Sequence, residues 1–170
     1  MDVRVFNVLF ISTGNSARSV MAEALLNALG GGRFHAFSAG CRPTGVVNRF
    51  AVELLGQNRI PTAGLRSKSW TEFVSPDAPN LDFVFTVCDR AAKEPPPLWP
   101  GQPLIAHWSI PDVSHIEGDV DARRRAFFRG YSALQGRLLL LVNLPIRKLD
   151  RAALQERIES IGMEAAALSG

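Results

Sequence analysis

Residues 6–29 read FNVLFISTGNSARSVMAEALLNAL, and this stretch decides the fold of the chain. The apolar run 6–11 has the length and composition of a buried strand. From residue 16 onward the apolar side chains recur at helical spacing, and Gly30-Gly31-Gly32 is typical of a helix end. The polar residues between the two segments form a turn that contains glycine. The sequence therefore predicts a strand, a short loop and a helix in direct succession.

The rest of the chain continues this alternation. Strand-like runs occupy 34–38, 81–87 and 103–107, and helical spacing covers 46–55 and 120–143. A last amphipathic helix is expected from its cap, Asp150, to Gly162, which we expect to terminate it. Strands that alternate with helices imply parallel pairing and right-handed crossovers. We therefore predict an α/β fold, a doubly wound, four-stranded parallel sheet flanked by helices, as a single domain over residues 1–170.

The composition is that of a globular protein: 46% of the 170 residues are apolar, 21% are charged and the net charge is +3. No apolar run approaches the ~18 residues that span a bilayer, and the N-terminus lacks the features of a signal peptide. We therefore expect a cytoplasmic protein with no membrane partner. The cluster Arg123-Arg124-Arg125 has no interleaved aromatic residues, so nucleic-acid binding is not expected. Two cysteines and three histidines without ligand spacing predict neither a disulfide framework nor a metal site.

The loop between the first strand and the first helix, residues 12–19, is the candidate functional site. Doubly wound sheets bind ligands at the carboxyl ends of their strands, and a helix N-terminus attracts anions with its free amides and its dipole. Gly14 lets the backbone form a concave nest of N–H groups, and Arg18 adds a charged fork that fits tetrahedral oxyanions. The alternative is a loop that only caps the helix. The predicted oxyanion-binding residues are Thr13, Gly14, Asn15, Ser16, Ala17, Arg18 and Ser19.

The sequence resembles the low-molecular-weight tyrosine phosphatases and the arsenate reductases that share their fold, in which this loop reads Cys-x5-Arg-Ser. It looks like the arsenate-reductase branch, whose loop commonly reads Cys-Thr-Gly-Asn-Ser-x-Arg-Ser followed by Met-Ala-Glu. Residues 13–19 and 21–23 match that pattern. Further similarity lies in 37–40, 64–70, 82–89, 107–108 and 111–112. The resemblance covers nearly the whole chain and implies a low-molecular-weight phosphotyrosine phosphatase-like fold.

Ser12 stands where the family has its nucleophilic cysteine. The family's thiolate is stabilised by the helix dipole, the arginine and a hydroxyl at the Ser19 position, and it attacks phosphorus or arsenic. A serine hydroxyl is far less acidic, and the loop holds no histidine to act as its base. We expect the anion site to form and most of the covalent chemistry to be lost. Two explanations stay open: a deliberate Cys→Ser replacement that traps a ligand, and a natural variant that binds without turnover.

The resemblance also implies a relay of two further cysteines near the end of the third strand. Cys88 matches the first of them, and the second falls in the loop 94–99, where this chain has Pro95-Pro96-Pro97. The internal relay is therefore incomplete, so that an external thiol would have to finish a reduction: thioredoxin, glutaredoxin or a low-molecular-weight thiol. The alternative for Cys88 is an inert buried thiol. Cys41 is not at a relay position, and we expect it to be a small, partly buried side chain.

Asp112, which follows Pro111, matches the general acid of the family, a residue that protonates the leaving oxygen. The alternative is an ordinary turn aspartate. The leading hypothesis is an arsenate reductase-like protein that binds arsenate or phosphate and reduces arsenate to arsenite only with cysteine at position 12 and an external thiol. The catalytic positions it implies are Ser12, Arg18, Asp112 and, as a redox thiol, Cys88.

Two other functions remain as alternatives. A phosphatase of the same family would hydrolyse phosphotyrosine or small phosphate monoesters. Such phosphatases carry tyrosines beside the acid aspartate, whereas Val113 and Ser114 follow it here, which disfavours phosphotyrosine as the substrate. The second alternative is a non-catalytic oxyanion-binding protein, which Ser12 favours. No cofactor is expected, because the chemistry of the family needs only side chains and thiols.

Overall fold

The computed structural model describes residues 4–168, and the side chains as far as residue 163. The strands are β1 (Phe6–Ser12), β2 (Phe34–Gly40), β3 (Phe83–Thr86) and β4 (Leu104–His107). The helices are α1 (Arg18–Leu29), α2 (Arg49–Gln57), α3 (Asp89–Ala92), α4 (Val120–Val142) and α5 (Arg151–Leu168), and two short 3-10 turns are η1 (Trp70–Phe73) and η2 (Ile146–Lys148).

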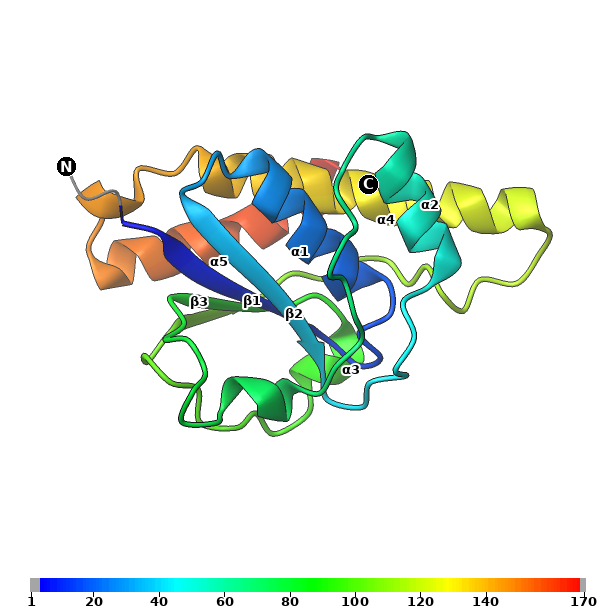
Figure 1. Cartoon of the computed structure of the whole chain (residues 1–170). Helices are drawn as coiled ribbons and strands as arrows, with labels where there is room; N and C mark the ends of the chain where they lie inside the picture. The colour runs from blue at the N-terminus through cyan, green and yellow to red at the C-terminus, as the bar shows by residue number, and fades with distance from the viewer. Residues whose placement is uncertain (1–3, 169–170) are drawn as a thin grey trace.

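The four strands form one parallel sheet in the order β2-β1-β3-β4. Ser12 at the end of β1 pairs with Gly40, and Ile11 pairs with Thr86, so the carboxyl ends of three neighbouring strands meet at one edge. In Figure 1, α1, α4 and α5 cover one face of the sheet, whereas α3 and the segment around η1 lie on the other side. The predicted α/β fold with a four-stranded parallel sheet flanked by helices is confirmed.

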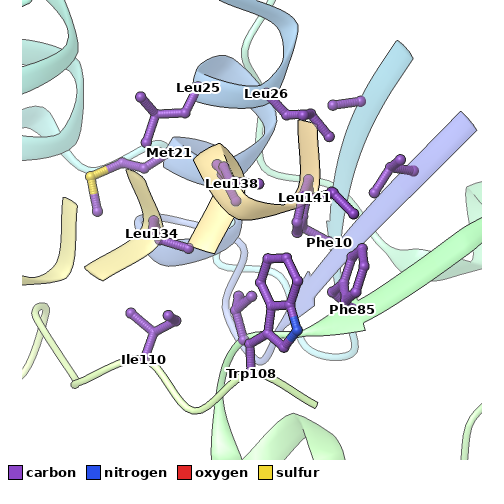
Figure 2. Close-up of a cluster of buried hydrophobic side chains, with 14 of the residues drawn as sticks. Phe10, Met21, Leu25, Leu26, Phe85, Trp108, Ile110, Leu134, Leu138 and Leu141 are labelled. Atoms are coloured by element: carbon purple, nitrogen blue, oxygen red, sulfur yellow. The ribbon is translucent and has the colours of Figure 1, made fainter. Parts of the chain in front are cut away.

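The larger part of the core lies between the sheet and the three long helices. Figure 2 shows this cluster, in which side chains of β1 and β3 meet those of α1 and α4. The apolar side chains that recur at helical spacing along α4 are buried: Phe127, Tyr131, Leu134, Leu138 and Leu141. Trp108 is fully buried, and its indole nitrogen donates a hydrogen bond to the Ile158 carbonyl of α5 at 2.9 Å. This bond ties the last helix to the segment that follows β4.

A second, smaller cluster covers the opposite face of the sheet. It consists of Leu9 and Ile11 of β1, Val84 of β3, and residues from η1, α3 and the proline-rich loop that close over them. Cys88 belongs to this cluster, and the partly buried Cys41 packs against it. The two cysteines of the chain therefore lie on the same side of the sheet.

The prediction that Gly162 terminates the last helix is wrong. Helix α5 continues through this glycine to Leu168. A Cβ atom at position 162 would lie 2.9 Å from Trp108 Cδ1 and 3.3 Å from the His107 carbonyl oxygen. Glycine is required here because α5 passes close to the segment after β4, and helix termination is not involved.

Helix ends differ from the predictions by a few residues. Helix α1 begins at Arg18, and α2 begins at Arg49 after Asn48, whose side chain accepts a hydrogen bond from the Phe50 amide at 2.9 Å. The cap at Asp150 is confirmed, because its carboxylate accepts from the Ala153 amide at 2.7 Å. Helix α1 ends at Gly30, as predicted.

The three consecutive arginines lie on the exposed face of α4. Arg124 pairs with Glu53 of α2 at 3.0 Å. Within residues 4–168, no helix combines the length and the apolar character that crossing a membrane requires.

Candidate functional site

The loop 12–18 leaves the carboxyl end of β1 and leads directly into α1, at the edge where β2 and β3 also end. It lines a pocket of about 720 Å³, together with residues that follow β2, β3 and β4. The predicted site residues that line this pocket are Ser12, Thr13, Gly14, Asn15, Ser16, Ala17, Arg18, Cys88 and Asp112. The structure therefore brings together groups that are far apart in the sequence.

The carbonyl groups of the loop are held away from the pocket by the segment that follows β2. Amides of residues 41–48 donate to the carbonyl oxygens of four loop residues. These bonds run from Cys41 to Ser12 (3.3 Å), from Arg42 to Thr13 (2.9 Å), from Thr44 to Gly14 (3.0 Å) and from Asn48 to Ser16 (2.8 Å). Because a peptide group is planar and trans, an outward carbonyl turns the following N–H inward. The loop thus presents a row of amides to its centre, as an anion-binding nest requires.

Asn15 holds the loop in this shape. Its φ angle is +46°, in the left-handed region where asparagine is one of the few tolerated side chains. The fully buried side chain donates to Ser19 Oγ at 2.8 Å and accepts from the Lys68 amide at 2.9 Å. Ser67 adds a further support, since its hydroxyl donates to the Gly14 carbonyl at 3.1 Å. The loop is therefore fixed from behind by the segment before η1.

Ser12 is buried at the base of the loop, with its hydroxyl 2.7 Å from Ser19 Oγ. The Asn15 amide donates to Ser12 Oγ at 3.0 Å. Among the described residues, these two groups are the hydrogen-bond partners of the Ser12 hydroxyl. Either serine can donate in the first bond, but neither partner is a base that could deprotonate the Ser12 hydroxyl. None of the three histidines contacts Ser12: His35 packs against Phe37, His107 bonds to Asp89, and His115, which lines the pocket, contacts Asp112.

Arg18 reaches from the first turn of α1 across the pocket. Its side chain is only 14% exposed. One guanidinium nitrogen donates to the Ile110 carbonyl at 3.0 Å, and the other lies 3.7 Å from Asp112 Oδ1. The hydrogen bond to the Ile110 carbonyl orients the guanidinium of Arg18. The longer contact with Asp112 leaves room for an anion that binds the guanidinium more strongly.

Asp112 lies on the segment after β4, opposite the loop. Its carboxylate accepts from the Ser114 amide and contacts His115 Nδ1, both at 3.0 Å. Burial alone would raise the pKa of Asp112, but the Ser114 amide, Arg18 and His115 together bring that pKa below its usual value. The carboxylate is therefore ionised at neutral pH. An oxyanion bound beside it would raise this pKa again, because like charges disfavour the ionised form.

Cys88 follows β3 and faces the same pocket. Its sulfur lies 3.3 Å from Thr13 Oγ1. Burial would raise the pKa of this thiol, but hydrogen bonds from the Thr13 side chain and from the Ala91 and Thr13 amides, with the charge of Arg18, bring the pKa below its usual value. Both cysteines are free thiols. The part of the chain that the structure describes contains no cluster of three or more His, Cys, Asp or Glu side chains that could hold a metal ion.

Comparison with known proteins supports the resemblance. Residues 7–105 match the low molecular weight phosphotyrosine protein phosphatase family. The chain belongs to this family. The match includes the loop, the strands β1, β2 and β3, and Cys88, and it ends within β4, before Asp112.

The relatives of this family member include arsenate reductases. The arsenate reductase of Bacillus licheniformis is 32% identical over 123 residues, which are 72% of this chain and 84% of that protein. The glutaredoxin arsenate reductase of Synechocystis is 29% identical over 105 residues, 62% of this chain and 76% of that protein. A solved arsenate reductase in the phosphate binding state superimposes with a TM-score of 0.63 at 25% identity, covering 81% of this chain and 97% of the other.

Sequence reasoning missed part of the support of the loop. Lys68 and Glu23 form a nearly buried pair behind it, 3.8 Å apart, and Glu23 also accepts from Ser38 Oγ at 2.7 Å. Burial raises the pKa of Glu23 and lowers that of Lys68, while each charge opposes the shift of the other. The sequence indicates the segment 64–70 only through the family resemblance, because its contacts to the loop depend on long-range packing that periodicity does not reveal.

Proposed function

We propose that this chain is an arsenate reductase-like protein that binds arsenate or phosphate in the loop 12–18, and that it reduces arsenate only when cysteine occupies position 12 and an external thiol is present. The observation that carries the proposal is the orientation of the loop. Four of its carbonyls are bonded outward to residues 41–48, so its amides face a pocket that also contains the Arg18 guanidinium. Amides and a charged fork around one point form a site for a tetrahedral oxyanion.

Because of Ser12, the chain would bind an oxyanion without reacting with it. A cysteine at this position would lie beside the Ser19 hydroxyl, the Asn15 amide and the N-terminus of α1, all of which stabilise a thiolate. These groups cannot ionise a serine hydroxyl, which has a far higher pKa and no basic partner here. The chain with Ser12 therefore binds the oxyanion without attacking it.

With cysteine at position 12, the reaction would be a covalent attack followed by disulfide formation. Asp112 takes up a proton when the bound oxyanion raises its pKa. The thiolate then attacks arsenic and forms an S–As bond, while an As–O bond breaks and the leaving oxygen takes that proton from Asp112. Cys88 then attacks the sulfur at position 12. A disulfide forms, the electron pair of the S–As bond stays on arsenic, and arsenite is released. Cys88 is suited to this step, because its pKa is lowered and it shares the pocket with the loop.

The disulfide must then be reduced by a thiol from outside. The prolines at 95–97 occupy the loop where the resemblance implies a second relay cysteine. A relative is described as a glutaredoxin arsenate reductase. That description makes a glutaredoxin one class of reductant to test beside thioredoxin and low-molecular-weight thiols.

The non-catalytic alternative is favoured by one observation, the absence of a base among the described partners of Ser12. If Ser12 belongs to a natural variant, the protein binds an oxyanion and performs no chemistry on it. The phosphatase alternative is disfavoured because Tyr131, the sole tyrosine of the chain, is buried on the core-facing side of α4, where it cannot contact an aromatic substrate.

Two assays in parallel test these functions: arsenate reduction coupled to each thiol system, and hydrolysis of p-nitrophenyl phosphate. Each is run on the chain with Ser12 and on Ser12→Cys. We expect turnover only in the Ser12→Cys form, with arsenate preferred. Preference for the phosphate ester would establish a phosphatase. Oxyanion binding without turnover in either form would establish the binding protein and contradict the reductase.

A further inference from the structure

The two cysteines of the chain lie on either side of Thr13. Cys41 follows β2 and Cys88 follows β3, the two strands that flank β1. Ser12 pairs with Gly40 and Ile11 pairs with Thr86, so continuing each register brings Cys41 and Cys88 level with Thr13. Both thiols face the same side of the sheet, where Cys88 is part of the apolar cluster and Cys41 packs against it.

The Thr13 hydroxyl influences the pKa of both thiols. It lies 3.3 Å from Cys88 Sγ, and a hydrogen bond from it opposes the rise in the pKa of Cys41. That rise is caused first by burial and then by the charge of Glu94, and the neighbouring Cys88 adds to it. The pKa of Cys88, in contrast, is lowered. Cys88 therefore has the larger thiolate fraction near neutral pH and attacks first, and Cys41 is the partner that attacks second.

We propose that Cys41 and Cys88 are a redox couple, a dithiol that closes to an intramolecular disulfide and displaces the oxyanion loop when it closes. The oxidant is a low-molecular-weight disulfide. The Cys88 thiolate attacks one of its sulfurs and releases one thiolate. Cys41 then loses its proton to water and attacks Cys88 Sγ, which releases the second thiolate. Two protein thiols lose two electrons in total, and one external disulfide becomes two thiols.

Closure requires movement of Thr13. Two strand spacings separate β2 from β3, about 9.6 Å, whereas the Cα atoms of a disulfide lie about 4.4–6.8 Å apart. Both cysteines lie just beyond the ends of their strands, and closure would also have to break the bond from the Cys41 amide to the Ser12 carbonyl. The two sulfurs can meet only if the side chain between them leaves. Since the Thr13 carbonyl is bonded to the Arg42 amide, this displacement disturbs the row of inward amides.

The disulfide therefore disfavours oxyanion binding, and a bound oxyanion disfavours formation of the disulfide. An oxyanion that binds the reduced loop more tightly must, by linkage, make the disulfide harder to form by the same factor. Cys88 and Thr13 line the same pocket as Arg18, so the external disulfide reaches Cys88 through the space that the oxyanion fills. Only this coupling rests on the proposed function, because the redox couple itself requires no oxyanion.

The full-length chain incubated with oxidised glutathione tests the couple. We expect both thiols to disappear together, with a monomer that has lost two hydrogen atoms in mass and carries no glutathione. The Cys41→Ser variant should instead stop at a glutathione adduct on Cys88. An unaltered chain that accumulates this adduct while Cys41 stays free, or that forms a disulfide-linked dimer, would overturn the proposal.

Phosphate affinity, measured by calorimetry before and after oxidation, tests the coupling. We expect about a tenfold loss of phosphate affinity in the oxidised, otherwise unaltered chain, and a thiol reductant should restore it. The oxidised monomer binding phosphate as tightly as the reduced one would overturn the coupling. If phosphate binds in neither state, the coupling and the proposed function both fail, while the thiol count still decides whether the couple exists.

Discussion

Arg18 and Asp112 face each other across the pocket, with 3.7 Å between the guanidinium Nη2 and the carboxylate Oδ1. The distance is long for an ion pair, and the Asp112 side chain is 41% exposed. This carboxylate occupies part of the space around Arg18 that an oxyanion would take. The pair thus places the group proposed to hold the oxyanion beside the group proposed to protonate it.

Replacing Asp112 by asparagine should strengthen oxyanion binding. The carboxylate is ionised above its lowered pKa, so at neutral pH it competes for Arg18 and repels a bound anion. We expect about fivefold tighter phosphate binding by Asp112→Asn in calorimetry at pH 7. Asp89→Asn is the matched control, because Asp89 also lines the pocket but pairs with His107 at 2.8 Å. Weaker binding by Asp112→Asn would show that the carboxylate supports the anion.

Asn15→Ala should unfold more easily and bind phosphate poorly. The change removes two buried hydrogen bonds, leaves the Lys68 amide without its acceptor and puts alanine at a positive φ. We expect a loss of about 2–4 kcal/mol in the free energy of unfolding in urea. The control is Asn27→Ala, since Asn27 also makes two hydrogen bonds, to the backbone of Ala36. The Asn27→Ala variant should lose stability but keep its phosphate affinity. If Asn15→Ala and Asn27→Ala lost phosphate affinity equally, Asn15 would have no specific role in the site.

Gly162→Ala should destabilise the protein although alanine favours helices. The new methyl group would meet the Trp108 ring at 2.9 Å, and the buried indole has little room to move. We expect a net loss of about 1–3 kcal/mol in thermal or urea unfolding. Gly136→Ala in α4 is the control, because no atom from elsewhere in the described chain lies within 4 Å of the place its methyl group would take. It should gain about 0.5–1 kcal/mol, so a gain in both variants would contradict the packing of α5 described above.

Thr13→Val should make Cys88 less reactive near neutral pH. The Thr13 hydroxyl is the largest influence that lowers the pKa of Cys88, so its loss shifts thiolate formation to higher pH. Iodoacetamide labelling across a pH series should show the Cys88 profile move upward in the variant. Thr86→Val provides the control, because that hydroxyl bonds to His107 at 2.7 Å. An unchanged Cys88 profile in Thr13→Val would mean that Arg18 or the backbone sets this pKa.

Much of the fold could be predicted from local sequence patterns. The apolar run ending at Ser12, the helical spacing after Arg18 and the caps at Gly30 and Asp150 each depend on neighbours in the chain. The prediction for Gly162 is wrong because a glycine late in an amphipathic segment looks like a terminator. Its true role depends on Trp108, which only the folded chain brings within reach.

The site was predictable in its residue types and not in its geometry. The loop motif indicates amides and Arg18, but not that residues 41–48 hold its carbonyls outward. Nor does it reveal the bond from Asn15 to the Lys68 amide. For Cys41 the sequence predicts only a partly buried side chain. Its position level with Thr13 follows from the register of β2 on β1, which the sequence does not encode locally.

Phosphate binding to the unaltered chain, to Arg18→Ala and to Arg42→Ala tests the central claim most directly. Arg42 also lines the pocket, but its side chain is 69% exposed and it pairs with Glu94. We predict measurable binding to the unaltered chain, a loss of at least about 30-fold in Arg18→Ala and less than about a threefold change in Arg42→Ala, as expected for a charged hydrogen-bonding fork inside the site. Unchanged affinity in Arg18→Ala would mean that the loop 12–18 is not the oxyanion site.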